Sequence, residues 1–169
     1  MTRHGWLLAL VITPALFCQK NDWLIVPGQR LGPILANTIR ADLHHSFAPG
    51  ATLEETLLTT VVSREIPGEA ITILWDGAGP DGHPRQIVLC QSRGPCRWHT
   101  ASGISAGRRL TEVQKMYGKP LTVVDRKIGI PACPGLLMLL LDGDPDSDPR
   151  VTGMEFLFPT PGEKPCAGR

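Results

Sequence analysis

The sequence has almost no excess of charge of either sign, and this absence limits the partners that it can bind. Its 17 Lys and Arg are opposed by 16 Asp and Glu, and the formal net charge is +1. The basic residues are scattered along the chain, and Arg108–Arg109 forms no more than a pair. Nucleic acids and anionic membrane surfaces are bound through dense basic patches. We therefore expect no nucleic-acid partner.

The sequence also lacks the residue spacings of several common catalytic and metal sites. It has no Cys-x-x-Cys pair, no His-Glu-x-x-His motif and no phosphate-loop Lys in the glycine-rich segment 76–82. Zinc enzymes and nucleotide-binding enzymes carry these spacings. The histidines His44, His45, His83 and His99 form no ligand cluster along the chain. We predict no catalytic residue and no cofactor, with a small envelope hydrolase or metal-binding enzyme as the alternative.

The N-terminus has the three-part pattern of a secretory signal. Arg3 lies in a short basic region, Trp6–Ile12 is an apolar run, and residues 19–22 are sharply polar. The apolar run is too short to span a bilayer. We predict that residues 1–18 are a signal peptide and that the mature protein is periplasmic or secreted. A buried first helix or strand is the alternative interpretation.

Cys18 leaves open whether the exported protein is anchored to a membrane. As the first residue after a lipoprotein signal, it would carry a lipid and make the chain a membrane-anchored structural lipoprotein. The bulky Phe17 before it fits that pattern poorly. We expect membrane association only if Cys18 is lipidated.

The remaining cysteines are even in number, as in a disulfide framework; they are Cys90, Cys96, Cys133 and Cys166. Export to an oxidising compartment favours bridges over free thiols. Cys90 and Cys96 flank the turn-forming stretch Gln-Ser-Arg-Gly-Pro, so a local bridge between them is sterically reasonable. Cys133 would then pair with Cys166, although four cysteines allow three pairings and the sequence does not choose among them.

The 16 Pro and 18 Gly predict many turns and short elements rather than long helices. Helical spacing of apolar residues occurs twice, from about residue 38 to Phe47 and from Leu110 to Tyr117. Between the turns, apolar runs predict a series of strands, near residues 23–26, 59–63, 70–75, 86–90, 121–124, 136–141 and 151–158. The predicted fold class is α+β, built from short helices and antiparallel β-hairpins, with Trp75, Trp98 and Tyr117 in the core.

An internal repeat organises these elements into two units. Gly28 and Gly32 have the same separation as Gly103 and Gly107, and each pair precedes a short helix that ends in an aromatic residue. Glycine permits the positive φ of a tight turn before the helix. One short helix over a small sheet buries too little apolar surface, so we predict that two units pack as one domain. The units span residues 22–92 and 93–169.

The stretch from Trp98 to Pro120 contains Gly103-Ile-Ser-Ala-Gly107, followed by Leu110-Thr-Glu-Val and Tyr117-Gly-Lys-Pro. This pattern resembles uncharacterised bacterial envelope proteins, and residues 27–47 are similar to the N-terminal stretch of the same proteins. More distantly, the paired glycines and short helix resemble outer-membrane assembly lipoproteins and tandem-repeat β-lactamase inhibitory proteins. The resemblance implies helices packed on an antiparallel sheet and a role in protein binding. It transfers no contact residue to this chain.

The sequence has one calcium candidate, a run of alternate carboxylates at Asp142, Asp144, Asp146 and Asp148. Such carboxylates can ligate Ca²⁺, but an EF-hand loop needs Gly at its sixth position and Glu at its twelfth. Ser147 and Gly153 occupy those positions here. The favoured interpretation is a solvated turn between two strands.

The export signal, the repeat and the lack of a catalytic constellation favour a non-enzymatic protein. We expect a periplasmic or envelope-associated module that binds another envelope or secreted protein. Two structural features separate the alternatives. A broad apolar sheet face would favour protein binding, whereas His or carboxylate side chains that converge in a deep pocket would favour a hydrolase.

Overall fold

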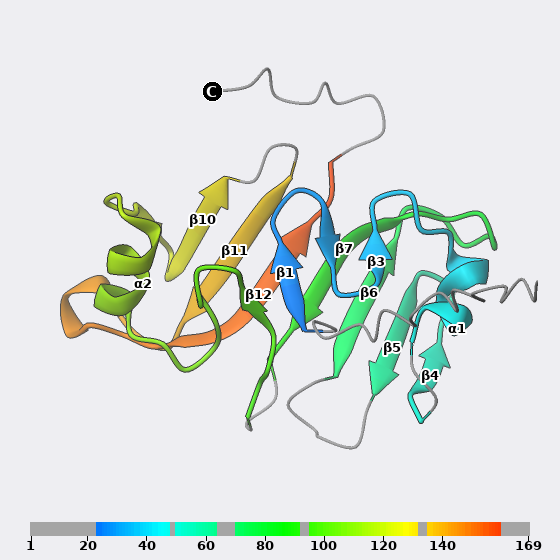
Figure 1. Ribbon diagram of the computed structural model, residues 1–169, viewed down its shortest axis with the longest axis horizontal. Coiled ribbons are helices and arrows are strands. Elements are labelled where there is room, and N and C mark those ends of the chain that lie inside the picture. The colour runs from blue at the N-terminus through cyan, green and yellow to red at the C-terminus, as the bar shows by residue number, and fades with distance from the viewer. Residues whose placement is uncertain (1–22, 48–49, 64–69, 92–94, 132–134, 160–169) are drawn as a thin grey trace, which may run out of the picture.

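The computed structural model describes residues 23–47, 50–63, 70–91, 95–131 and 135–159 (Figure 1). The predicted signal peptide, with Cys18, lies outside the described residues. So do Cys133 and Cys166, and with them the second predicted disulfide.

An eight-stranded antiparallel sheet forms most of the molecule, with strand order β4-β5-β6-β7-β12-β11-β10-β9 (Figure 1). Strands β7 and β12 pair at its centre, and β4 and β9 are its edges. The order of strands from β7 out to β4 therefore mirrors the order from β12 out to β9. The strands are β4 (Thr52–Glu55), β5 (Thr59–Ser63), β6 (Ile71–Trp75), β7 (Pro84–Leu89), β9 (Val123–Val124), β10 (Lys127–Pro131), β11 (Leu136–Leu141) and β12 (Val151–Leu157).

A smaller sheet of order β3-β2-β1-β8 lies in front of the middle of the large sheet in Figure 1. Its strands are β1 (Leu24–Val26), β2 (Arg30–Leu31), β3 (Ile34–Leu35) and β8 (His99–Thr100). β1 pairs with β8 in parallel, so this sheet joins the beginning of the described chain to the segment after β7.

The turns of the small sheet and the segment after it depend on glycine. Gly28, Gly32, Gly103 and Gly107 all have positive φ, between 53° and 87°. The Gly32 amide donates to the Leu24 carbonyl, which closes the turns between β1 and β3. A residue with a Cβ would be strained at these positions.

Two short helices lie at opposite ends of the large sheet, α1 (Leu43–Ser46) and α2 (Leu110–Tyr117) (Figure 1). α2 has the predicted bounds, and Gly118 ends it in the left-handed conformation, with φ 73°. The first helix is shorter than predicted: a 3-10 turn, η1 (Arg40–Asp42), precedes α1. No described helix has the length and apolar character needed to cross a membrane.

The sequence predicts that Asn37 or Thr38 caps the first helix, and the structure shows why the helix begins later. The Thr38 hydroxyl accepts a hydrogen bond from the Leu35 amide, 2.9 Å away, and so closes the turn after β3 instead of capping a helix. The broad class α+β holds, but the described chain is predominantly β with only two short α-helices.

The core lies against one face of the large sheet. Alternate residues of its strands are buried, as in β6 and β11, because successive side chains of a strand project to opposite faces. Leu43 of α1, Val113 of α2, and Ile25 of β1 belong to the same buried cluster. The helices and the small sheet therefore cover this face, with Trp75 and Trp98 buried in it as expected. Tyr117, also expected in the core, is half-buried and packs against it.

Candidate functional site

The opposite face of the large sheet carries a broad apolar surface, which we call the open face. It consists of the alternate residues of the four central strands β6, β7, β12 and β11 that project away from the core. All of them are partly exposed except Gly153, which is buried. The partly exposed residues are Thr72, Leu74, Gln86, Val88, Leu136, Met138, Leu140, Glu155 and Leu157.

The register aligns these residues in rows that cross the four strands. One row runs Thr72, Val88, Glu155, Met138, and the row beside it runs Leu74, Gln86, Leu157, Leu136. Neighbouring side chains in a row lie within contact distance because paired Cβ atoms are about 5 Å apart. The apolar surface is therefore continuous rather than a set of isolated side chains.

Two glycines flatten the open face. At Gly153 a Cβ atom would lie 3.2 Å from Cδ1 of Leu140, and at Gly129 it would lie 3.4 Å from Cδ1 of Leu136. Each leucine therefore lies over a glycine of the neighbouring strand instead of standing out from the sheet. This packing leaves both leucines half-buried and gives a low surface on which another flat surface can rest.

One charged group lies among these apolar side chains. Glu155 is the only ionisable residue of the open face, and Nε2 of Gln86 donates to its Oε2 over 3.2 Å. Glu155 and Gln86 come from the two strands that pair at the centre of the sheet. The next ionisable residues on this side are Glu54 on edge strand β4 and Lys127 on β10. The carboxylate thus lies at the centre of the apolar surface.

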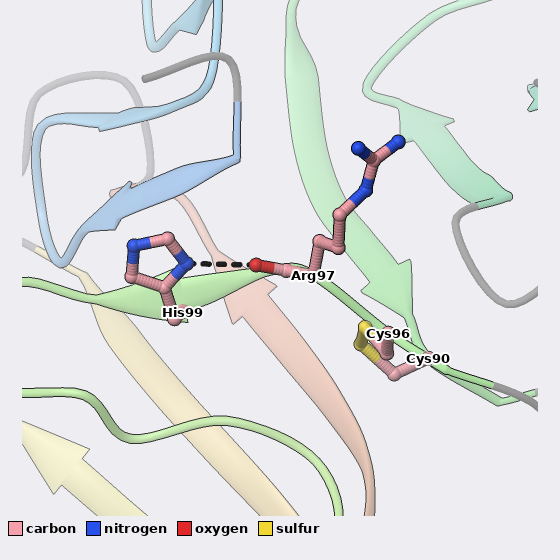
Figure 2. Close-up of a disulfide and its surroundings, with 4 residues drawn as sticks. All are labelled: Cys90, Cys96, Arg97 and His99. Atoms are coloured by element: carbon pink, nitrogen blue, oxygen red, sulfur yellow. Dashed lines mark hydrogen bonds between the residues drawn. A yellow bond between two sulfur atoms is a disulfide. The ribbon is translucent and has the colours of Figure 1, made fainter. Parts of the chain in front are cut away.

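On the core side of the large sheet, a disulfide joins the end of β7 to the segment that leads into β8 of the small sheet. Cys90, directly after β7, is joined to Cys96, and their Cα atoms are 5.6 Å apart (Figure 2). This bridge is the one expected from the turn between the two cysteines. Nδ1 of His99 donates to the Arg97 carbonyl over 2.7 Å, which holds the start of β8 (Figure 2).

Beside this bridge, Trp23 packs edge-on against Trp98, with ring centroids 5.1 Å apart. The Arg97 guanidinium lies 4.5 Å from the Trp23 ring centroid, within the range of a cation–π contact. These contacts hold together the segments next to β1 and β8 of the small sheet, which packs over the centre of the large sheet.

Three of the four aspartates of the calcium candidate, Asp142, Asp144 and Asp148, bind different parts of the protein. Asp142 Oδ1 accepts the Arg150 amide, 2.7 Å away, and Asp144 forms an ion pair with Arg126. Asp146 lies in a 3-10 turn, η3 (Pro145–Ser147), between β11 and β12. Among the described residues no three His, Cys, Asp or Glu side chains come together as a metal site.

Asp148 binds the beginning of α2. Its carboxylate accepts the Thr111 amide at 3.0 Å and the Thr111 hydroxyl at 3.2 Å, and it lies 3.4 Å from Nη1 of Arg109. The hydrogen bond from the Thr111 backbone is the largest of the effects that lower the pKa of Asp148. A free helix N–H is thereby satisfied by a distant side chain.

The histidines lie on separate elements. His44 and His45 are exposed on α1, with Nε2 of His44 4.0 Å from a Glu55 oxygen. The His83 ring lies 3.2 Å from the Thr38 carbonyl. Together with His99, which is held by Arg97, they do not converge on one another.

One serine lies between two glycines at a spacing that is typical of nucleophilic serines. Gly103-Ile-Ser105-Ala-Gly107 has the spacing Gly-x-Ser-x-Gly, and the backbone of Ser105 pairs with that of His99. A nucleophile elbow sits between a strand and a helix, with the serine in a strained turn. Here the two glycines take the positive φ values and Ser105 does not, and no hydrogen bond joins its hydroxyl to the His99 ring.

Two shallow depressions lie away from the open face. One is lined by Arg40, His44 and Glu55 with the loop 78–80, and the other by residues of the turns after β9 and β11. In the first, the Arg40 side chain donates to the carbonyls of Thr56 and Leu57 and pairs with Glu55. These polar groups are engaged in holding the β4–β5 turn.

The open face is thus an apolar surface that the packing of the described chain leaves uncovered. Comparison of the chain with protein-family models, curated proteins and solved structures finds no match.

Proposed function

We propose that this chain is an exported, non-enzymatic module that binds another protein through the open face of its large sheet. The observation that carries the proposal is the composition of β11, Leu-Leu-Met-Leu-Leu-Leu. A strand with a continuous apolar run is typical of a sheet covered on both faces. Within the described chain, only one face of this sheet is covered, and we infer that a partner covers the other.

The energetics support the same proposal. Burial of apolar surface stabilises a complex by roughly 25 cal/mol per Å², and monomeric proteins rarely leave broad apolar patches in water. Six large apolar side chains, those of Leu74, Val88, Leu136, Met138, Leu140 and Leu157, remain partly exposed on the open face. Because Leu136 and Leu140 lie flat over glycines, the surface can be covered without rearranging the strands.

The proposed location is the periplasm, the cell envelope or the exterior. The signal-like N-terminus and the Cys90–Cys96 bridge support it, because such bridges persist in oxidising compartments. The partner is then another envelope or secreted protein.

The proposed architecture is two related units, residues 22–92 and 93–169, that share one core. The mirrored strand orders β7 to β4 and β12 to β9 support it, as do the paired glycines before each helix. In such an arrangement the open face extends across both units, and its centre lies where they meet.

Photocrosslinking in the cells that produce the protein tests the binding surface. A benzoylphenylalanine is placed at Val88 or Met138 on the open face, and at Asp146 in η3 as a control away from it. We expect both open-face positions to give the same protein adduct and Asp146 to give none. A Met138→Asp substitution should reduce the adduct formed from position 88. Equal adducts from all three positions, or none from the open face, would contradict the proposal.

A further inference from the structure

We infer that the partner presents a cationic side chain, arginine or lysine, to Gln86 and Glu155 at the centre of the open face, inside an apolar contact. The inference rests on the proposed function, and it names the chemistry of the partner: a protein surface with one basic group among aliphatic or aromatic ones, and not a second copy of this chain.

The position of Glu155 carries the argument. Its cross-strand neighbours are Val88 on β7 and Met138 on β11, and Leu157 lies in the next row on its own strand. In the free protein this partly buried carboxylate is still accessible to solvent. A partner that covers the apolar side chains around it removes that water, and a buried carboxylate without compensating hydrogen bonds is strongly destabilising.

This chain supplies only part of the compensation. Gln86 donates one hydrogen bond, to Oε2, and no described residue donates to Oε1. Lys127 on β10, the cation of this side, is two strands from β12 and one row further along, so it lies more than about 10 Å from Glu155. A second donor with positive charge must therefore come from the partner, and a guanidinium or ammonium group meets that need.

The same charge disfavours a symmetric dimer through this face. In a two-fold contact the same patch occurs on both partners. Glu155 lies beside the centre of the face, on β12, so the contact would bring two carboxylates close to each other. None of the open-face residues of the four central strands is a cation, and Arg85 of β7 lies at the bulge where that strand begins. A different protein with complementary charge avoids this repulsion.

The test uses a phage-displayed library of disulfide-cyclised random peptides as the probe. Peptides are first selected for binding to the folded, oxidised protein. Those that also bind its Met138→Asp variant are then discarded, so that the peptides that remain are those that need the intact open face. We expect the retained sequences to be enriched in arginine or lysine flanked by apolar residues. The strongest binder is then synthesised twice, once with its basic residue and once with a neutral isostere, citrulline for arginine or norleucine for lysine.

The wild-type protein should bind the cationic peptide about tenfold more tightly than the neutral one, the effect of about 1.4 kcal/mol. The Glu155→Gln variant keeps the size of the side chain, and it should bind the two peptides equally. As a matched control, Glu54→Gln at the edge strand should leave the tenfold ratio unchanged. Thermal unfolding of each variant verifies that it is folded.

The outcomes separate the inference from the proposed function. Retained peptides with no basic enrichment, or a ratio that survives Glu155→Gln, would overturn the inference while leaving protein binding at the open face intact. Sedimentation of the wild-type protein as a dimer that Met138→Asp dissociates would overturn it in favour of a second copy. Absence of open-face adducts in the photocrosslinking experiment would remove the proposed function itself.

Discussion

The two faces of the eight-stranded sheet are built from similar side chains but differ in their surroundings. On β12, Phe156 is fully buried, whereas the next residue, Leu157, is only partly buried; on β7, Ile87 and Val88 differ in the same way. The helices and the small sheet cover one face, and nothing in the described chain covers the other. The comparison teaches that an apolar side chain in this sheet stabilises the fold only where the chain itself supplies the cover.

The first prediction has the largest expected effect. It compares the loss of unfolding free energy when a core-facing residue and an open-face residue of β12 are each replaced by alanine. Phe156→Ala leaves a cavity in the core and should cost about 3–5 kcal/mol of unfolding free energy. Leu157→Ala removes a partly buried side chain and should cost about 1 kcal/mol. Chemical denaturation measures both. Equal losses would mean that the open face is as well packed as the core.

The second prediction concerns the bridge that ties the cover to the sheet. Replacing Cys90 and Cys96 together by serine should lower the unfolding free energy by about 2 kcal/mol, because a short closed loop is released in the unfolded chain. Reductant should shift the wild-type protein toward the double variant and should not shift the variant. If the unfolding free energy falls further in the double variant than in the reduced wild-type protein, the serine side chains themselves, and not the missing bridge, cause the extra loss.

The third prediction concerns Arg40, whose side chain holds the turn between the edge strand β4 and β5. Arg40 is almost fully buried and binds the carbonyls of Thr56 and Leu57, at the turn that exposes Leu57 and Leu58. Arg40→Met should cost about 1–2 kcal/mol because it leaves these carbonyls without a protein donor. Faster amide exchange at Thr59 should accompany it. Arg126→Met, which breaks a solvent-exposed ion pair, should change stability little.

The fourth and smallest effect is the pH dependence of the α2 attachment. Asp148 has a lowered pKa in the folded protein because Thr111 donates to its carboxylate. Its contribution is therefore fully present above the usual value of 3.8 and is lost as the pH falls below it. Thermal melts of Asp148→Asn should lack this part of the acid dependence. The exposed Asp146→Asn should retain it.

Elements with a single strong local signal were predictable. α2 begins at Leu110 and ends before Gly118, as the apolar spacing and the glycine indicate. The run Leu136–Leu141 forms β11 with the predicted bounds. The local bridge between Cys90 and Cys96 followed from the turn between them.

Elements that depend on distant partners were missed. β10 contains Gly129 and ends at Pro131, which weaken the strand signal, yet its pairing with β11 makes it a strand. β8 has two residues and exists because β1 lies parallel to it. The contacts of Asp148 with α2 join residues far apart in the sequence, so spacing predicted only a solvated turn or a calcium ligand.

The amino-acid sequence by itself determined the kinds of element, the turns that glycine requires, the neutral charge and the abundance of apolar residues, because these depend on neighbouring residues alone. Only the tertiary structure decided which apolar residues are buried and which form the open face. Both sides of β11 are apolar, and alternation cannot say which side faces the helices. The pairing of β7 with β12 decided that Gln86 and Glu155 meet at the centre of that face, because it joins strands that are distant in the sequence.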